Sequence, residues 1–290
     1  MNRKYVLTIA VLCTVLIEPI QAFADIKLGV FPRRPADVTQ KTFQPLAEQM
    51  SKELGETVQV IVPPNFKEFW KGVENKEYDI VHYNQYHYVK SNKEYGYRVI
   101  VANEEFGNKS IAGALIVRKD SGINSVSDLK GKTILFGGGK KAMGSYIAPT
   151  AILQKAGLKE GIDYKVKFAK NPPSAVVGVY KKQADVAASG NVILKIKGVT
   201  KKIDTSEMKI LAESDSFIHL PWAVKDSLSP EKTDKLQSFM LSLGDSKEGK
   251  LILKAAKVTG FQKVSDDDFS VVRDIAANVE LLNKQFASDQ

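Results

Sequence analysis

The chain has 290 residues, of which 43% are hydrophobic, and a formal net charge of +9. This length and composition predict one or two domains with ordinary hydrophobic cores. The positive charge favours anionic partners. Nucleic acid is excluded as the main partner, because the lysines are scattered along the chain and no nucleic-acid-binding motif is present. A basic surface exposed to solvent explains most of the charge.

The first 24 residues have the pattern of an export signal. A short basic start precedes an apolar run over residues 5–17, and Ala22–Phe23–Ala24 is the small-x-small pattern that signal peptidase cleaves. The alternative, a membrane anchor, needs about 20 apolar residues, and this run is shorter. We therefore expect a periplasmic protein cleaved near Ala24. Its mature chain lacks cysteine, since Cys13 is the only one.

Strands and helices alternate after the signal. Strand patterns cover residues 26–31, 58–62 and 78–83, and helical spacing covers residues 41–54 and 66–74. This order predicts a βαβαβ unit with a parallel sheet. Two more strands are expected, at residues 98–102 and 112–118.

The same plan returns in the second half of the chain. The expected strands are at residues 133–136, 164–168 and 185–188, and the expected helices at residues 146–156 and 175–182. Extended segments at 208–214 and 217–224 follow, and then helices that include 232–243 and 269–282. Two such units predict an α/β fold with two lobes, each a mixed, mostly parallel sheet flanked by helices.

The second unit is predicted to be inserted into the first. Residues 25–110 and 216–290 would form the first lobe and residues 111–215 the second, so that the chain crosses between the lobes twice. Two crossings can act as a hinge that closes the lobes on a ligand. The alternative is a pair of tandem domains divided once near residue 115, which would leave the helices after Pro230 on the second lobe.

Several motifs resemble the phosphonate, phosphate and phosphite type of solute-binding protein that serves ABC importers. They are Leu28–Gly29–Val30–Phe31–Pro32, Tyr78–Asp79–Ile80–Val81 followed by Tyr83 and Tyr86, Val117–Arg118–Lys119–Asp120–Ser121–Gly122–Ile123, Ser127–Asp128–Leu129–Lys130–Gly131–Lys132, and Pro149 with Leu153 and Ala156–Gly157–Leu158. The resemblance covers nearly all of the mature chain. It implies a type 2 periplasmic-binding-protein fold that holds a small oxyanion between the lobes. The implied partner is the importer's membrane permease or, alternatively, the periplasmic domain of a sensor kinase.

One motif departs from this family. Similar phosphonate binders carry a Ser-Thr-Ser-Gly run at a helix start, and alignment on Pro149 places Ala142–Met143–Gly144–Ser145 there. The helix amides and the helix dipole still favour an anion. This departure argues against a plain aminoalkylphosphonate and leaves phosphate, phosphite, another phosphonate or an arsenic-type analogue. The ligand contacts expected here are Lys141, Gly144, Ser145 and Tyr146.

Other candidate contacts lie where predicted strands end. Arg33 and Arg34 follow the first strand, and an arginine fork suits oxyanions, although an exposed basic loop is an equal alternative. Thr39 either offers its hydroxyl to the ligand or caps the next helix. In the second lobe, Ser189 and Asn191 follow the strand at residues 185–188.

The run from His82 to Tyr88 is the most unusual in the mature chain. It supplies five further predicted contacts, which are His82, Tyr83, Asn84, Tyr86 and His87, and His219 near the second crossing adds a sixth. Three hypotheses for the histidines stay open. They are buried and bonded to backbone, they donate hydrogen bonds to an anion, or His82, His87 and His219 bind a transition metal.

The sequence lacks common motifs of catalysis. There is no Gly-x-Ser-x-Gly elbow and no His-Glu-x-x-His pair, and Gly131–Lys132–Thr133 lacks the first glycine of a phosphate-binding loop because Val126 stands there. We therefore expect a monomeric binding protein with neither enzymatic activity nor a cofactor.

Overall fold

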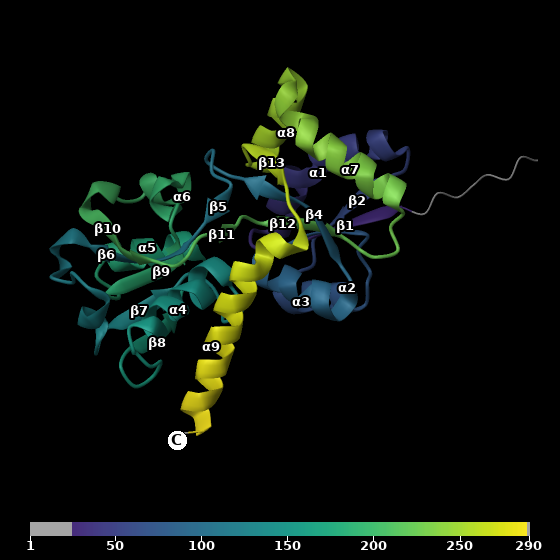
Figure 1. The fold of residues 1–290 in the computed structure, drawn as a ribbon. Helices are drawn as coiled ribbons and strands as arrows, with labels where there is room; N and C mark the ends of the chain where they lie inside the picture. Colours follow the sequence, from purple (N-terminus) through teal and green to yellow (C-terminus); the bar gives the residue numbers. More distant parts are fainter. Residues whose placement is uncertain (1–24, 289–290) are drawn as a thin grey trace, which may run out of the picture.

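The computed structural model describes residues 25–288, so the predicted signal segment lies outside the described residues. Two separate sheets organise the chain (Figure 1). The first lobe is built on a sheet of order β13–β4–β12–β3–β1–β2. Its strands are β1 (Ile26–Val30), β2 (Val58–Ile61), β3 (Ile80–His82), β4 (Arg98–Glu104), β12 (Pro221–Val224) and β13 (Gly260–Lys263).

The second lobe is built on a sheet of order β10–β6–β9–β7–β8. Its strands are β6 (Gly113–Arg118), β7 (Thr133–Phe136), β8 (Lys165–Phe168), β9 (Val186–Gly190) and β10 (Met208–Glu213). Both sheets are mixed. For example, β1 pairs in parallel with β2 and β3, whereas β12 runs antiparallel to β3 and β4. The predicted two-lobed α/β fold with helix-flanked sheets is confirmed.

Helices cover both sheets. Those of the first lobe are α1 (Ala36–Leu54), α2 (Phe66–Glu74), α3 (Gln85–Tyr95), α7 (Pro230–Ser242) and α8 (Lys247–Ala256). Those of the second are α4 (Ala148–Lys155), α5 (Pro172–Tyr180) and α6 (Lys197–Thr200), and a π-helical turn over Met143–Ile147 leads directly into α4. The last helix is α9 (Ser270–Ser288). Among residues 25–288, no helix combines the length and the apolar character needed to cross a bilayer.

The helix α1 illustrates how the sequence sets local structure. Phe43, Leu46, Ala47 and Met50 recur at helical spacing and are all buried against the sheet. Gly55 ends the helix in the left-handed conformation, with φ of 71°, which glycine adopts without steric cost. The helix begins five residues earlier than the pattern at 41–54 predicts, because Ala36, Asp37 and Val38 are exposed and the buried apolar face begins only at Phe43.

The helix α3 was absent from the prediction. It begins after Asn84, whose side chain accepts a hydrogen bond from the amide of His87, and it ends at Gly96 in the left-handed conformation. The predicted strand over residues 217–224 is also corrected, because it divides into β11 (Phe217–Ile218) and β12.

Two strands lie between the lobes. The strand β5 (Ser110–Ile111) connects β4 to β6, and β11 connects β10 to β12, and the two pair with each other antiparallel. The helix α9 lies beside this connection and packs against both α3 and α4 (Figure 1). The hydroxyl of Tyr86 in α3 donates to Glu280 in α9 at 2.7 Å. Each lobe therefore contacts the same terminal helix.

Candidate functional site

The carboxyl ends of the parallel strands gather charged and polar residues in the first lobe. Arg33 lies just beyond β1, His82 ends β3, Glu105 follows β4, and His219 precedes β12, which pairs with β3 and β4. This is the edge at which open α/β sheets bind ligands. Arg33, His82 and His219 are three of the predicted ligand contacts, and Glu105 is an addition to them.

The ring of His82 is held in the core. It stacks on Trp222 at 4.3 Å between centroids, and its Nδ1 lies 3.1 Å from the carbonyl oxygen of Pro221. Because a carbonyl only accepts, Nδ1 carries the proton, and the buried Nε2 is left as an acceptor without a partner. Burial holds the pKa of His82 well below its usual value, and the charge of Arg33 acts in the same direction. The neutral ring therefore has no free N–H for an anion.

His219 has the opposite tautomer. The amide of Leu220 donates to Nδ1 at 2.8 Å, so the buried Nε2 carries the proton and has no hydrogen-bond partner. Glu105 lies 3.7 Å from this Nε2 and also 3.9 Å from the guanidinium of Arg33. Burial lowers the pKa of His219 even though Glu105 raises it. His219 thus offers a neutral N–H donor beside a cation.

Two arginines add positive charge to this edge. The side chain of Arg33 is 36% exposed and its guanidinium lies 5.0 Å from the centroid of Phe31. Burial lowers the pKa of Arg33, and it lowers the pKa of Arg34 to about 10, with the charge of Arg33 adding to the effect. Both guanidinium groups remain charged at neutral pH.

Contact between the lobes is made at two helix starts. Asn84 caps α3 through its side-chain oxygen, and its side-chain nitrogen donates to the carbonyl of Lys141 at 3.2 Å. Lys141 lies two residues before Met143, where the helical segment begins. The positive ends of both helices are thus brought together, since the first amides of a helix have no partner inside it.

Glycines shape the second-lobe side of this contact. A Cβ at Gly138 would lie 2.9 Å from Oγ of Ser145, and a Cβ at Gly144 would lie 4.0 Å from Cα of Gly190. The loop after β7 and the end of β9 therefore approach the helix start closely. Ser189, next to Gly190, is buried and its Oγ has no hydrogen-bond partner.

Five of the predicted contact residues have side chains engaged elsewhere. The hydroxyls of Tyr83, Tyr86 and Tyr146 bond to Ser91, Glu280 and Glu160, that of Thr39 donates to the carbonyl of Pro35, and Asn191 bonds to the amide of Ala112 and to Glu213. Tyr83 and Tyr146 are also buried within their own lobes. The structure does not bring these side chains together with the strand-end charges.

The second histidine of the run, His87, packs among aromatic rings. Its ring packs against Phe66 and Trp70 at 6.3 and 5.1 Å, and its Nδ1 is buried without a partner. Within residues 25–288, no three histidine, cysteine or acidic side chains lie close enough together to hold a metal ion. The described arrangement therefore does not group His82, His87 and His219 as a metal site would require.

A family model described as the periplasmic substrate-binding protein of a phosphonate ABC transporter matches residues 28–269. The chain belongs to this family. This phosphonate-family protein is 23% identical to the phosphonates-binding periplasmic protein of Escherichia coli, over 97% of this chain and 86% of the relative. The family consists of binding components, so the protein is not an enzyme, as predicted.

Two further comparisons extend this result. The phosphonate-family protein is 29% identical to the tetrathionate sensor histidine kinase TtrS of Salmonella typhimurium, over 65% of this chain and 33% of the kinase. The solved structure of PhnD1 from Prochlorococcus marinus in complex with methylphosphonate matches with a TM-score of 0.75 and 20% identity, covering 88% of this chain and 98% of that one. The structural likeness establishes the two-lobed periplasmic-binding-protein fold.

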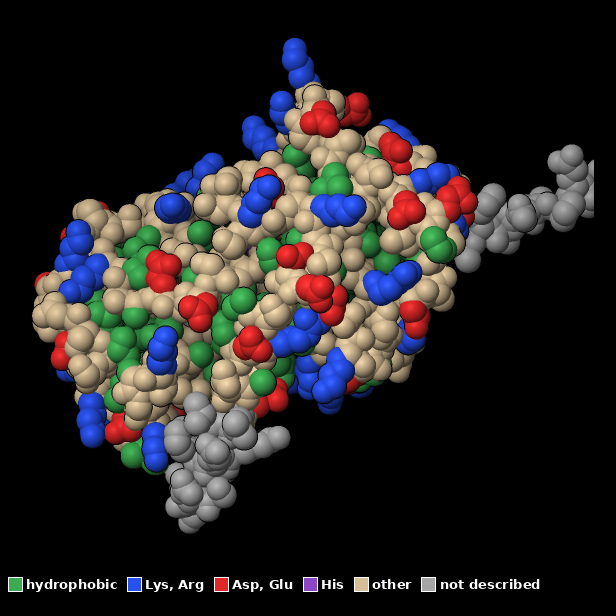
Figure 2. Space-filling view, in the orientation of Figure 1, with side chains coloured by type: hydrophobic (Ala, Val, Ile, Leu, Met, Phe, Trp, Pro, Cys, Tyr) green, Lys and Arg blue, Asp and Glu red, His purple; other side chains and the backbone are tan. Residues whose placement is uncertain are grey.

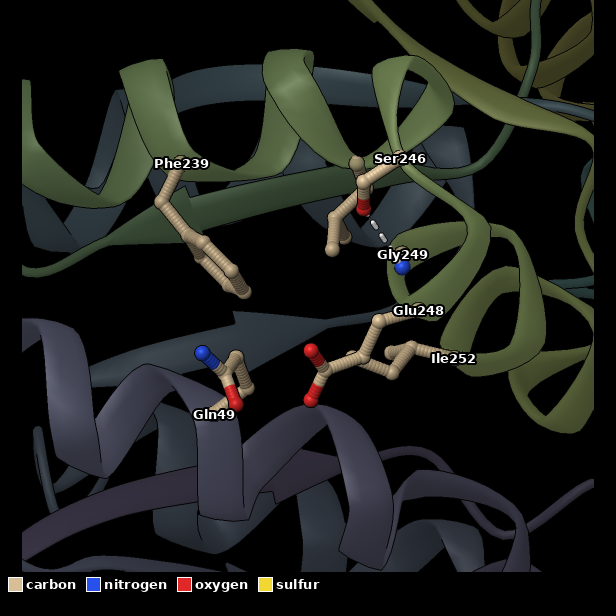
Figure 3. Close-up of a pocket in the computed structure, with 7 residues that line it drawn as sticks. Gln49, Phe239, Ser246, Glu248, Gly249 and Ile252 are labelled. Atoms are coloured by element: carbon tan, nitrogen blue, oxygen red, sulfur yellow. Dashed lines mark hydrogen bonds between the residues drawn. The ribbon is translucent and has the colours of Figure 1, made fainter.

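The hollow drawn in Figure 3 is separate from the strand-end residues. It lies between α1, α7 and α8 and is lined by side chains that include Gln49, Phe239, Glu248 and Ile252, while Ser246 caps α8 through the amide of Gly249 at 2.9 Å. None of the predicted site residues lines it. In the face shown in Figure 2, lysines and arginines are spread among acidic side chains and form no single basic patch.

Proposed function

We propose that the protein captures a small oxyanion of phosphate, phosphite or phosphonate type between its lobes and delivers it to the membrane permease of an ABC importer. Family membership supports the transport role. The name of the Escherichia coli relative and the methylphosphonate complex of PhnD1 support the ligand class. An arsenic-type analogue of the same shape and charge belongs to the same class of candidates.

The contact between Asn84 and Lys141 carries this proposal. It joins two helix starts and places the positive ends of two helix dipoles beside a lysine. Like partial charges repel each other, and an anion between them offsets that repulsion while accepting hydrogen bonds from the free amides. The ligand therefore stabilises the arrangement in which the lobes touch.

Closure follows from where the donors lie. The amides after Lys141 belong to the second lobe, whereas Arg33 and the N–H of His219 belong to the first. A ligand that binds both sets has its full contacts only when the lobes are together. Such a ligand shifts the population toward the closed state by its difference in affinity for the two states.

Calorimetry and small-angle scattering test this proposal with phosphate, phosphite, methylphosphonate and arsenate. We expect at least one anion to bind and to reduce the radius of gyration. The variant Lys141→Ala should bind about fivefold more weakly, whereas Lys140→Ala is the matched control because Lys140 pairs with Glu160 at 3.3 Å. No heat and no compaction with all four anions would refute the proposed function.

A second candidate function, in signalling, is favoured by one observation, the similarity to the sensor kinase TtrS. In this alternative the loaded protein contacts the periplasmic domain of a sensor kinase. Deletion of the gene separates the two outputs. Loss of anion uptake indicates an importer, whereas intact uptake with loss of the transcriptional response to the anion indicates a sensor partner.

A further inference from the structure

Four aromatic rings form a continuous row at the strand-end edge of the first lobe. Phe31 contacts Phe66 edge to face at 6.3 Å, Phe66 stacks on His87 at 6.3 Å, and His87 contacts Trp70 at 5.1 Å. Phe31 and His87 are buried, but Phe66 is 46% exposed. The row therefore presents one aromatic ring to the outside.

The position of Phe66 is fixed by the fold. It is the first residue of α2, and the preceding Asn65 caps this helix by accepting from the amide of Glu68 at 2.9 Å. The helix starts after β2, which runs parallel to β1, so Phe66 lies at the same edge as Arg33 and His82. Leu251 on α8 is more exposed, at 66%, but is not part of this row.

Positive charge lies on both sides of the exposed ring. On one side Arg33 stands over Phe31 at 5.0 Å. On the other side, His87 lies in the first turn of α3, and Asn84, which caps α3, bonds to Lys141. Burial lowers the pKa of His87 most, and the charge of Lys141 lowers it further. A ligand that contacts Phe66 and also reaches these cations binds most tightly when it has both an apolar group and an anionic group.

We propose that Phe66 contacts the carbon substituent of the ligand, and that the protein takes phosphonates with an apolar alkyl or aryl group in preference to inorganic phosphate or phosphite. This inference rests on the proposed function and specifies its substrate. The phosphonate oxygens face the helix starts, and the C–P bond directs the substituent toward the ring.

The test compares methylphosphonate with phenylphosphonate by calorimetry. Burial of an aryl group against the ring predicts that phenylphosphonate binds about tenfold more tightly than methylphosphonate. The variant Phe66→Ala should lose about this factor for phenylphosphonate and change methylphosphonate binding less than twofold. Phe66→Leu, which keeps an apolar side chain, should retain most of the preference, and Leu251→Ala should leave it unchanged.

Each outcome has a distinct meaning. If methylphosphonate binds and phenylphosphonate binds no better, or if Phe66→Ala weakens both equally, the inference is overturned while the proposed function stands. If neither compound nor an inorganic oxyanion binds, the proposed function fails and the inference with it. Thermal unfolding of each variant verifies that the fold is kept.

Discussion

Replacement of Asn84 by alanine tests the coupling between helix capping and lobe contact. The substitution removes two hydrogen bonds, the cap to the amide of His87 at 2.9 Å and the contact with the carbonyl of Lys141 at 3.2 Å. Loss of an N-cap costs about 1 kcal/mol, and loss of a hydrogen bond between neutral groups costs about 1 kcal/mol more. We expect the free energy of unfolding to fall by about 2 kcal/mol.

The chain supplies a matched control in Asn65. Its side chain caps α2 in the same way, through the amide of Glu68 at 2.9 Å, and this bond lies within one lobe. Asn65→Ala should therefore cost only the cap, about 1 kcal/mol. Urea unfolding measures both losses of stability. Small-angle scattering without ligand should show a larger radius of gyration, from more widely separated lobes, in Asn84→Ala alone.

A third variant separates the two bonds. Asn84→Asp keeps an oxygen that caps the helix but removes the N–H that reaches Lys141. It should lose about 1 kcal/mol of stability, the share of the bond to Lys141, and have lobes as far apart as those of Asn84→Ala. Equal losses of stability and equal radii of gyration for Asn84→Ala and Asn65→Ala would refute the reasoning, since the lobe contact would then contribute nothing.

Three further predictions concern the pH dependence and the packing of the fold. Burial lowers the pKa of His87 to about 3, so its ring stays neutral in the folded protein, whereas it is protonated near pH 6.5 in the unfolded chain. The contribution of His87 to stability is therefore complete above pH 6.5 and is lost as the pH falls below it. His87→Phe should reduce this loss in urea titrations at acid pH, and an unchanged dependence of the free energy of unfolding on pH would contradict the account. Gly113→Ala should cost about 1–3 kcal/mol, because its Cβ would lie 2.5 Å from that of Ala148, whereas Gly139→Ala, with open space around it, should be nearly neutral in the same assay; equal effects would contradict this account. Ser91→Ala should cost about 1–3 kcal/mol by leaving the buried hydroxyl of Tyr83 unpaired, and Tyr83→Phe should abolish that cost in the double variant if the bond at 2.6 Å is its cause.

Much of the fold could be predicted because its strands are short apolar runs bounded by turn residues. The strand β7 matches the predicted residues 133–136, and β1 and β9 agree with their predictions to within two residues at either end. The helix α3 was missed because tyrosine, histidine and lysine give it little apolar periodicity. Only its two caps, Asn84 and Gly96, were local signals, and a helix prediction based on apolar spacing does not use them.

The candidate site was predictable only in part. Strand ends can be located in the sequence, which makes Arg33 and His82 predictable, and His219 follows from its place near the second crossing between the lobes. The partner of a side chain is a tertiary fact, so the bonds of Tyr83 to Ser91 and of Tyr86 to Glu280 could not be foreseen. Glu105 and Phe66 were missed for the same reason, because their importance lies in neighbours from other elements.

The position of β12 has a consequence for biogenesis. This strand lies between β3 and β4 in the middle of its sheet, although more than a hundred residues separate it from either in the chain. Until residues 221–224 have been synthesised, β3 and β4 each lack a neighbour and expose backbone groups that other chains can pair with. The strands of the other sheet come from one uninterrupted segment, residues 113–213. The strands of this segment can therefore pair early, whereas the sheet of order β13–β4–β12–β3–β1–β2 is complete only after the later part of the chain is present.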